Sequence, residues 1–407
     1  MRKIGLLENS IQEYAWGSRT AIAELLGQAV PADKPQAELW MGAHPKAPSQ
    51  VLYNGLSKSL LEVIDENPEE ILGKETAEKF SGRLPFLFKV LAAAKPLSIQ
   101  AHPNKEQAAQ GFARENELGI PLDASHRNYR DDNHKPEIIC ALTPFWALNG
   151  FRRVSGILEL LERTQVPILA ETVLYLQNRP SQAGLKQFFY HLITMEGKEQ
   201  GKIVEEVVGF AEKRLDEDPV WTWVVRLNQE YPGDIGVVSP IFLNLVQLEP
   251  QQAMYLPAGE LHAYLEGVGI ELMANSDNVL RGGLTPKHID VQELLTILDF
   301  SGGELNILRP GKLESGEAVY PTKAAEFVLS VIQVNATVPF RSARNRSIEI
   351  VICTEGEARV TDLGDGEITL LTKGTSIIVP AAVEQYSIEG EATLYKAAVP
   401  VLKGDRA

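Results

Sequence analysis

The first part of the chain carries short apolar runs separated by polar and turn-forming residues. Phe86-Leu-Phe-Lys-Val-Leu91 and Leu97-Ser-Ile-Gln-Ala-His102 are typical of β-strands, and a further strand is predicted over residues 138–142. Asn104 and Gln107 have the spacing of a capping box, in which the two side chains satisfy free backbone N–H groups at a helix start. A helix is therefore predicted to follow Asn104.

Between residues 152 and 232 the apolar positions change to a helical spacing. They recur at i, i+3, i+4 and i+7, which predicts amphipathic helices that bury one face. Trp221, Trp223 and Val224 fit one such helix, and three more segments show the same spacing: Ser155–Glu162, Ala183–Ile193 and Ile203–Glu212. The pattern predicts a helical domain of residues 152–232 inserted into a β domain.

Strand-like runs return after the helical segment. Ile241-Phe-Leu-Asn-Leu-Val246 is typical of a strand, and strands are expected to continue through His262. Residues 285–296 are predicted to form a helix with Pro286 in its first turn. From about residue 320 to residue 407 the pattern is again that of strands and turns.

Composition limits the class of protein. A chain of 407 residues with 44% hydrophobic and 23% charged residues indicates a globular protein of two or three domains. The net charge of −15 argues against nucleic acid or an anionic membrane as the main partner. No run approaches the roughly 20 apolar residues of a membrane span. The two cysteines, Cys140 and Cys353, exclude a disulfide framework. We therefore expect a cytoplasmic protein.

Three polar clusters that lie far apart along the chain offer the ligands of a single metal site. They contain Gln100 and His102, then His134 and Glu137, and finally His262. Imidazole, carboxylate and amide groups together suit zinc or a similar divalent ion. Gln100 and His102 are two residues apart in a predicted strand, so their side chains point to the same face.

The same clusters resemble the motifs of a known family. The chain is similar to the type I mannose-6-phosphate isomerases, which are zinc enzymes of cupin fold. The resemblance rests on six segments: Glu13-Tyr-Ala-Trp-Gly-Ser18, Ala37-Glu-Leu-Trp-Met-Gly-Ala-His-Pro45, Gln100-Ala-His-Pro-Asn-Lys105, His134-Lys-Pro-Glu137, Pro257-Ala-Gly-Glu-Leu-His-Ala-Tyr264 and Arg281-Gly-Gly-Leu-Thr-Pro-Lys287. It implies a mainly β fold of jelly-roll cupin barrels with a helical insertion.

The resemblance also implies a ligand set for the metal. The predicted zinc ligands are Gln100, His102, Glu137 and His262. His134 lies three residues before Glu137, which would place both on one face of a helical turn, but Pro136 disfavours a helical residue before it. In the family the His and Lys of this motif lie at the substrate, and His134 is therefore left out of the metal shell.

Catalytic and substrate-binding roles are expected for side chains near these motifs. Lys135 and Glu271 are the candidate bases, and Arg281 is expected to polarise the substrate oxygens. His134 is a candidate acid–base for ring opening. The predicted substrate contacts are Tyr264 and Asp277, with basic side chains at the rim for the phosphate: Lys89, Lys105 and Lys287.

A short internal repeat predicts a second cupin barrel. Met254–His262 can be aligned with Ile377–Gln385, since in both an apolar strand meets a Pro-Ala turn. Gln385 stands where the first copy has His262, and no His follows His288. We expect residues 1–151 and 233–320 to form the catalytic barrel, and residues 321–407 a metal-free, degenerate copy.

The predicted function is that of an isomerase acting on a small sugar phosphate. The resemblance implies interconversion of mannose 6-phosphate and fructose 6-phosphate with one zinc ion per chain, and we expect a monomer. Two alternatives remain. A cupin oxygenase would bind Fe(II) through two or three His and a carboxylate, whereas the amide Gln100 and the lack of a close His-x-His pair weigh against it. A non-catalytic sugar-binding cupin would not need Lys135 and Arg281 beside the ligands.

Overall fold

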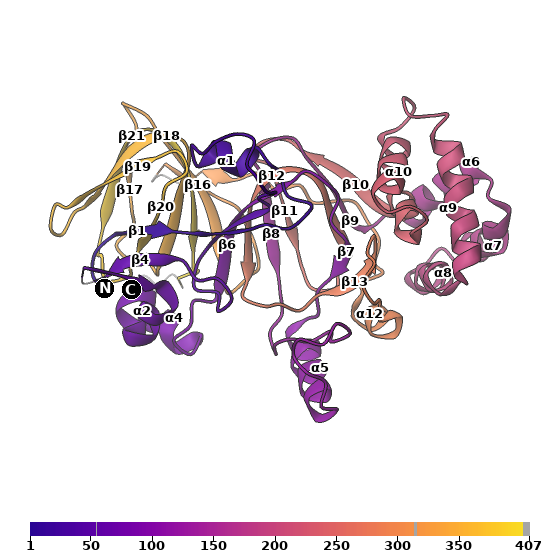
Figure 1. Ribbon diagram of the computed structural model, residues 1–407, viewed down its shortest axis with the longest axis horizontal. Helices are drawn as coiled ribbons and strands as arrows, with labels where there is room; N and C mark the ends of the chain where they lie inside the picture. The colour runs from indigo at the N-terminus through magenta and orange to yellow at the C-terminus, as the bar shows by residue number, and fades with distance from the viewer. Residues whose placement is uncertain (54, 313–315, 402–407) are drawn as a thin grey trace, which may run out of the picture.

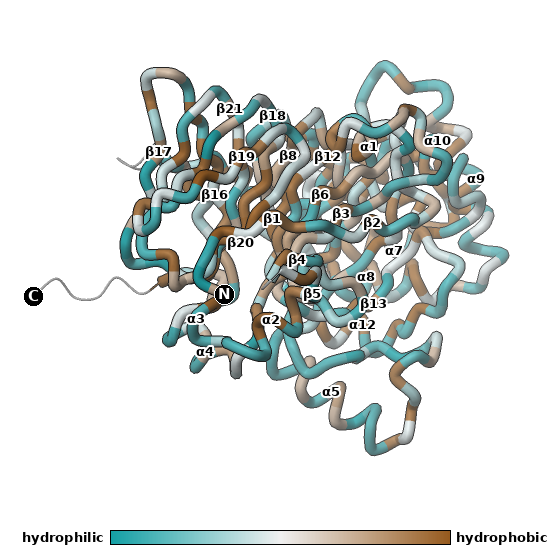
Figure 2. Tube along the Cα trace, turned by 60° about the vertical axis from the view of Figure 1, so that its left-hand side comes forward, coloured by the Kyte–Doolittle hydropathy of each residue, from teal (hydrophilic) through white to brown (hydrophobic). Residues whose placement is uncertain are grey.

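The computed structural model describes residues 1–53, 55–312 and 316–401. In this part of the chain two β units lie next to each other, and a group of helices extends from the end of one of them (Figure 1). Hydrophobic residues gather along strands such as β1, β8 and β20, and hydrophilic residues dominate the outer loops (Figure 2). The predicted combination of mainly β structure with a helical insertion is confirmed.

The first β unit is a ten-stranded sheet arranged around one long strand. The order is β10-β9-β12-β6-β3-β2, and β7, β8, β11 and β13 pair at its sides. The strand β12 pairs with β6, β7, β8 and β9, so it brings residues from four strands together. The bounds are β2 (Ser10–Gln12), β3 (Glu38–Met41), β6 (Phe86–Ala93), β7 (Ile99–Ala101), β8 (Glu137–Ala141), β9 (Phe145–Phe151), β10 (Leu243–Leu248), β11 (Ala253–Leu256), β12 (His262–Ala274) and β13 (Leu280–Gly283).

The second β unit has eleven strands and takes three of them from the N-terminal part of the chain. Its order is β14-β15-β16-β21-β18-β20-β1-β4-β5, with β17 on β21 and β19 on β18. The bounds are β1 (Gly5–Glu8), β4 (Gln50–Tyr53), β5 (Leu56–Ser59), β14 (Gly311–Lys312), β15 (Glu317–Val319), β16 (Val328–Val334), β17 (Phe340–Arg341), β18 (Glu349–Asp362), β19 (Ile368–Thr372), β20 (Ser376–Val379) and β21 (Tyr386–Ala398). The predicted domain bounds stay a prediction, and they did not foresee that β1, β4 and β5 join this sheet.

The aligned repeat segments occupy matching places in the two units. In the first unit β8 pairs with β11 on one side and β12 on the other, and in the second β18 pairs with β20 and β21 in the same way. His262 is the first residue of β12, and Gln385 directly precedes β21. The strand pairing therefore supports the repeat that the two Pro-Ala segments predicted.

Helices form the chain between β9 and β10. Their bounds are α6 (Val154–Thr164), η1 (Pro167–Leu169), α7 (Ala170–Asn178), α8 (Gln182–Thr194), α9 (Gly197–Ala211), α10 (Pro219–Glu230), η2 (Ile235–Val238) and α11 (Ser239–Phe242). Trp221 and Trp223 of α10 are buried in the core of this group, as the spacing predicted. Ile241 and Phe242 lie in α11 and not in a strand, so β10 begins two residues later than predicted. None of the helices in the described ranges is both long and apolar enough to cross a membrane.

The remaining helices lie outside the helical insertion, and their bounds are α1 (Ala21–Leu25), α2 (Leu60–Glu66), α3 (Pro68–Leu72), α4 (Lys74–Lys79), α5 (Lys105–Glu117) and α12 (Val291–Ile297). The capping box predicted for α5 is confirmed, since Asn104 and Gln107 bond each other's backbone N–H. The helix predicted over 285–296 was wrong at its start. Helix α12 begins at Val291, capped by Asp290, because the N–H of Thr285 is held by Asp234 instead.

Candidate metal and active site

Three buried side chains meet at one end of the first β unit. His262 begins β12, Glu137 begins β8, and His102 directly follows β7. The Nε2 atoms of His102 and His262 each lie 3.4 Å from a carboxylate oxygen of Glu137. Two ligands of one tetrahedral zinc, each bound at about 2.0–2.1 Å, would be separated by roughly the same distance. Within the described ranges these three residues are the group that could hold a metal ion.

The hydrogen bonds around the cluster show how well it suits a cation. His102 Nδ1 lies 2.7 Å from the carbonyl oxygen of Asn278, and His262 Nδ1 lies 2.9 Å from that of Glu260. A carbonyl only accepts, so each Nδ1 carries the proton and each Nε2 presents a lone pair. Both Nε2 atoms and Glu137 Oε2 are buried and have no hydrogen-bond partner among the residues that the structure describes. Three electron-rich atoms that face one another at this depth are stabilised when a divalent cation lies between them.

Electrostatics keep His102 and Glu137 unprotonated. Burial, together with the Lys135 ammonium, lowers the pKa of His102 to about 4. Burial alone would raise the pKa of Glu137, but Lys135 and His102 lower it well below its ordinary value. Lys135 Nζ lies 3.0 Å from Glu137 Oε1, so this lysine is part of the buried cluster and not a surface residue.

Strand register places two more predicted residues on the same face as His262. Gln100 of β7 is the direct partner of His262 on one side and of Arg281 in β13 on the other. Directly paired residues of antiparallel strands project to the same face of the sheet. The amide of Gln100 and the guanidinium of Arg281 are therefore directed to the side of the sheet that carries the His262 imidazole. Their roles as ligand and as substrate contact stay predictions.

Lys89 lies inside the barrel and not at its rim, where the sequence analysis had placed it. Its Nζ lies 2.8 Å from Glu271 and 3.5 Å from Glu38, and 5.6 Å from the centre of the Trp40 ring. Two carboxylates outweigh the effect of burial and raise the pKa of Lys89. Tyr264 is also fully buried, with its ring centre 6.0 Å from that of His262.

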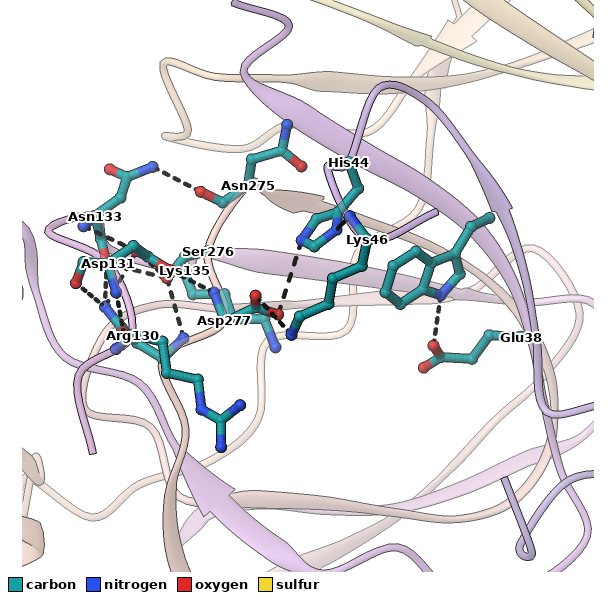
Figure 3. Close-up of polar contacts among 12 residues, drawn as sticks. Glu38, His44, Lys46, Arg130, Asp131, Asn133, Lys135, Asn275, Ser276 and Asp277 are labelled. Atoms are coloured by element: carbon teal, nitrogen blue, oxygen red, sulfur yellow. Dashed lines mark hydrogen bonds and ion pairs between the residues drawn. The ribbon is translucent and has the colours of Figure 1, made fainter. Parts of the chain in front are cut away.

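Asp277 is the centre of a second polar group at the same end of the unit (Figure 3). Lys46 Nζ lies 2.8 Å from one carboxylate oxygen, and His44 Nε2 lies 3.7 Å from the other. His44 packs edge-on against Trp40, with the ring centres 4.9 Å apart. Burial opposes ionisation of Asp277, but Lys46 and His44 lower its pKa. His44 lies in Ala37–Pro45, a segment that the sequence had marked, whereas no motif had marked Lys46.

Two other cationic side chains, Arg130 and Lys287, interact electrostatically with Arg281. Burial lowers the pKa of Arg281, and the positive charge of Arg130 lowers it further. The charge of Arg281 in turn lowers the pKa of Lys287. Like charges that lower one another's pKa destabilise the charged forms, and a bound anion would relieve this repulsion. We call Arg130, Arg281 and Lys287 the cationic group. Lys105, by contrast, is an exposed residue at the start of α5. Sequence reasoning missed Arg130, because no spacing relates it to Arg281.

His134 makes its contact with the second β unit. Its Nε2 lies 2.8 Å from Glu326, a buried residue just before β16. Lys135 and Glu137 contact each other, while His134 alternates with them along an extended segment and takes the opposite side. The structure therefore brings Lys135 to the cluster and directs His134 to Glu326.

The fold and the buried His-Glu-His cluster together define a two-unit β protein with a metal-binding type of site. Three family models match successive parts of the chain: the catalytic domain of phosphomannose isomerase type I at residues 4–154, its helical insertion domain at 160–243, and the cupin domain of mannose-6-phosphate isomerase at 317–399. The chain belongs to the type I phosphomannose isomerase family.

Individual relatives agree with this assignment over almost the full length. The mannose-6-phosphate isomerase of Salmonella typhimurium is 42% identical over 95% of this chain and 97% of its own length. The human enzyme of the same name is 37% identical over 91% of this chain and 88% of its own. A zinc-bound crystal structure of mannose 6-phosphate isomerase superposes with a TM-score of 0.90 at 40% identity, covering 98% of this chain and 100% of that one.

Proposed function

We propose that the protein interconverts mannose 6-phosphate and fructose 6-phosphate at the cluster of His102, Glu137 and His262, with zinc as its bound metal. The observation that carries this proposal is a set of buried ligand atoms that have no hydrogen-bond partner in the described part of the chain. It is accompanied by Arg130, Arg281 and Lys287, whose positive charges influence one another. The first set suits a divalent ion and the second suits a phosphate. The full-length relatives named mannose-6-phosphate isomerase support the same substrate pair.

The two histidines and Glu137 would hold the zinc, and Gln100 is the proposed fourth ligand from its register with His262. A bound zinc acts as a Lewis acid that stabilises negative charge on substrate oxygens. The carbonyls of Asn278 and Glu260 fix both imidazoles in the tautomer that offers Nε2 to the metal.

We assign the acid–base chemistry at C1 and C2, namely proton transfer between the carbons and proton donation to the substrate oxygens, to Lys135 or Glu271. Lys135 lies against a metal ligand, and its ammonium can donate to an oxygen that gains negative charge. Glu271 is a buried carboxylate whose pKa is raised by burial, which moves it toward the range that suits a general base near neutral pH. His134 is the weaker candidate for ring opening, because Glu326 already holds its Nε2.

We assign the substrate phosphate to Arg130 and Lys287 of the cationic group. The charge of Arg281 interacts with those of Arg130 and Lys287, and Arg281 pairs with Gln100 across β13 and β7. We therefore propose that Arg281 contacts the sugar oxygens between the metal and the phosphate. Guanidinium groups present paired donors that match phosphate oxygens. Tyr264 and Asp277 stay proposed sugar contacts.

We also propose that the enzyme works as a cytoplasmic monomer. Both cysteines are free and buried, which suits a reducing compartment. Light scattering during size-exclusion chromatography measures the mass directly. A particle of 44.9 kDa is expected, and a stable particle of twice that mass would contradict the monomer.

A coupled isomerase assay on metal-depleted protein tests the proposed function. Depletion should abolish conversion of mannose 6-phosphate, and zinc added back should restore it, with cobalt and manganese as comparison ions. Zinc-loaded protein that converts neither sugar phosphate would contradict the proposal. Oxygen uptake by iron-loaded protein without isomerase activity would favour a cupin oxygenase instead.

A further inference from the structure

Two irregular segments are joined beside the metal cluster by a dense group of hydrogen bonds. One runs from Arg130 to Asn133, and the other runs from Asn275 to Asn278. Ser276 Oγ donates to Asp131 Oδ1 at 2.8 Å, and the N–H of Asp277 donates to Asp131 Oδ2 at 2.7 Å. Figure 3 shows these contacts, with the Arg130 guanidinium extending away from them. Because neither segment is in a strand, side chains supply the bonds that hold the two together.

Asn278 is the completely buried residue of this junction. Its Oδ1 accepts from the N–H groups of Arg130 and Asp131, at 2.7 and 3.2 Å. Its Nδ2 donates to the carbonyls of Asp131 and Asn133, at 2.8 and 2.9 Å, and to Asp131 Oδ1 at 3.2 Å. Both lone pairs and both protons of the amide are used, which an Asp or a Leu of the same size cannot reproduce.

The main chain of Asn278 reaches the metal cluster directly. Its carbonyl oxygen accepts the hydrogen bond from His102 Nδ1 that fixes the tautomer of this proposed ligand. The side chain of Asn278 holds the position of that carbonyl, since it anchors the residue to the facing segment. The facing segment ends four residues before Glu137 and carries Arg130 of the cationic group. Asn278 thus bonds to both groups. Its main-chain carbonyl accepts from His102, and its side chain accepts from the N–H of Arg130.

We propose that Asn278 is a positioning residue that couples the metal cluster to the cationic group. Its carbonyl orients His102, and its side chain places Arg130. The anion half of this inference rests on the proposed function, because it assigns phosphate to Arg130, whereas the metal half does not. Residues that orient a ligand from outside the coordination shell typically change metal affinity by 10- to 100-fold when altered.

The test is the near-isosteric Asn278→Asp variant of the full-length protein. It keeps an acceptor for the two N–H groups, but places an oxygen against the carbonyls of Asp131 and Asn133. Zinc affinity, measured by competition with a chromophoric chelator, should fall by about tenfold. Affinity of the zinc-loaded protein for inorganic phosphate, measured by calorimetry, should also fall by about tenfold. Asn335→Ala, which removes an Asn that closes a turn in the second unit, should change neither.

If Asn278 had a purely structural role, the Asn278→Asp variant would have a lower melting temperature but unchanged affinities for zinc and phosphate. If either affinity of folded Asn278→Asp protein stays within about twofold of the parent, the coupling is refuted. Should that variant not fold, Ser276→Ala removes a weaker part of the same junction, its bonds to Asp131 and Asn133. It should shift both affinities in the same direction by about threefold, and unchanged affinities there would equally overturn the proposal. The zinc measurement needs no sugar phosphate, so it stands even if the proposed function fails.

Discussion

The two β units share one three-strand arrangement but differ in the polar residue near the start of its last strand. In the first unit His262 stands at the start of β12, and within the described ranges its Nε2 has no hydrogen-bond partner. In the second unit the matching Gln385 has both amide atoms occupied, since Nε2 donates to the carbonyl of Ser342 and Oε1 accepts from Arg341. The first arrangement leaves ligand atoms available, and the second does not.

The buried charges near β18 and β21 of the second unit compensate one another. Lys396 in the second unit lies 2.9 Å from both Glu349 and Glu317, and Arg346 also contacts Glu349. Two cations and two carboxylates neutralise one another there without any ion. In the first unit burial and Lys135 lower the pKa of His102, and three facing atoms of His102, Glu137 and His262 have no hydrogen-bond partner among the described residues. A shared strand arrangement therefore supports a buried group of ion pairs in the second unit and a cluster of ligand atoms suited to a metal in the first.

The largest expected effect comes from His262. His262→Ala should lower turnover by roughly 10³-fold or more, because charge stabilisation by a metal contributes several kcal/mol. Gln385→Ala, at the matching place in the second unit, is the control and should keep parental turnover. Comparable losses in both variants, measured in the coupled assay, would mean that the units do not differ as described.

The second unit should respond to Lys396→Met by losing stability and not metal. Removal of this buried cation leaves Glu349 and Glu317 uncompensated, which typically costs about 3–5 kcal/mol. Denaturant unfolding, followed by far-ultraviolet circular dichroism, measures the loss of stability. The zinc content should stay at the parental level. Lys373→Met, an exposed lysine of the same unit, is the matched control. A Lys396→Met protein as stable as the parent would show that the network does not support this unit.

Lys135 and Arg281 separate catalysis from metal binding in the first unit. Neither is a usual zinc ligand, so Lys135→Ala and Arg281→Ala should retain zinc and fold. Each should lower kcat/KM by roughly 10²-fold if it acts on protons or on developing charge. A fall in kcat alone indicates action in the transition state, and a rise in KM indicates binding of the phosphate. Arg359→Ala in the second unit is the control, and near-parental kcat/KM in both site variants would move the chemistry to Glu271.

The smallest expected effect is the pH dependence of phosphate binding. Arg281, burial and Arg130 lower the pKa of Lys287, so this lysine loses its proton at a lower pH than an ordinary lysine. Phosphate affinity should therefore weaken on the alkaline side by roughly tenfold, the worth of one charge-assisted hydrogen bond. Lys287→Arg should remove that decline, since arginine stays protonated, and Lys105→Arg should not. Identical alkaline profiles for the parent and Lys287→Arg would remove Lys287 from the phosphate site.

Local sequence patterns predicted the helices and strands, and sequence motifs predicted the cluster of His102, Glu137 and His262. The capping box of Asn104 and Gln107 is complete within four residues, so the sequence alone identifies it. His102, Glu137 and His262 were found because each lies in a distinctive motif. Lys89 was misplaced because its burial depends on Glu38 and Glu271, which come from other strands.

Long-range contacts account for what could not be predicted. Strand β1 pairs with β20 across more than three quarters of the chain, and nothing in a four-residue strand specifies such a partner. Asn278 stands in a run of short polar residues that is typical of any surface loop. Its importance follows only from the hydrogen bonds to Arg130, Asp131 and Asn133, which are set by the tertiary fold.

The most direct test of the account is the number of zinc ions bound per chain. Elemental analysis of purified, dialysed protein should give one zinc per chain for the parent and for Gln385→Ala, and none for His262→Ala. A full equivalent of zinc in His262→Ala, or a second tightly bound equivalent in the parent, would contradict the claim that the first unit holds the metal and the second is its scaffold.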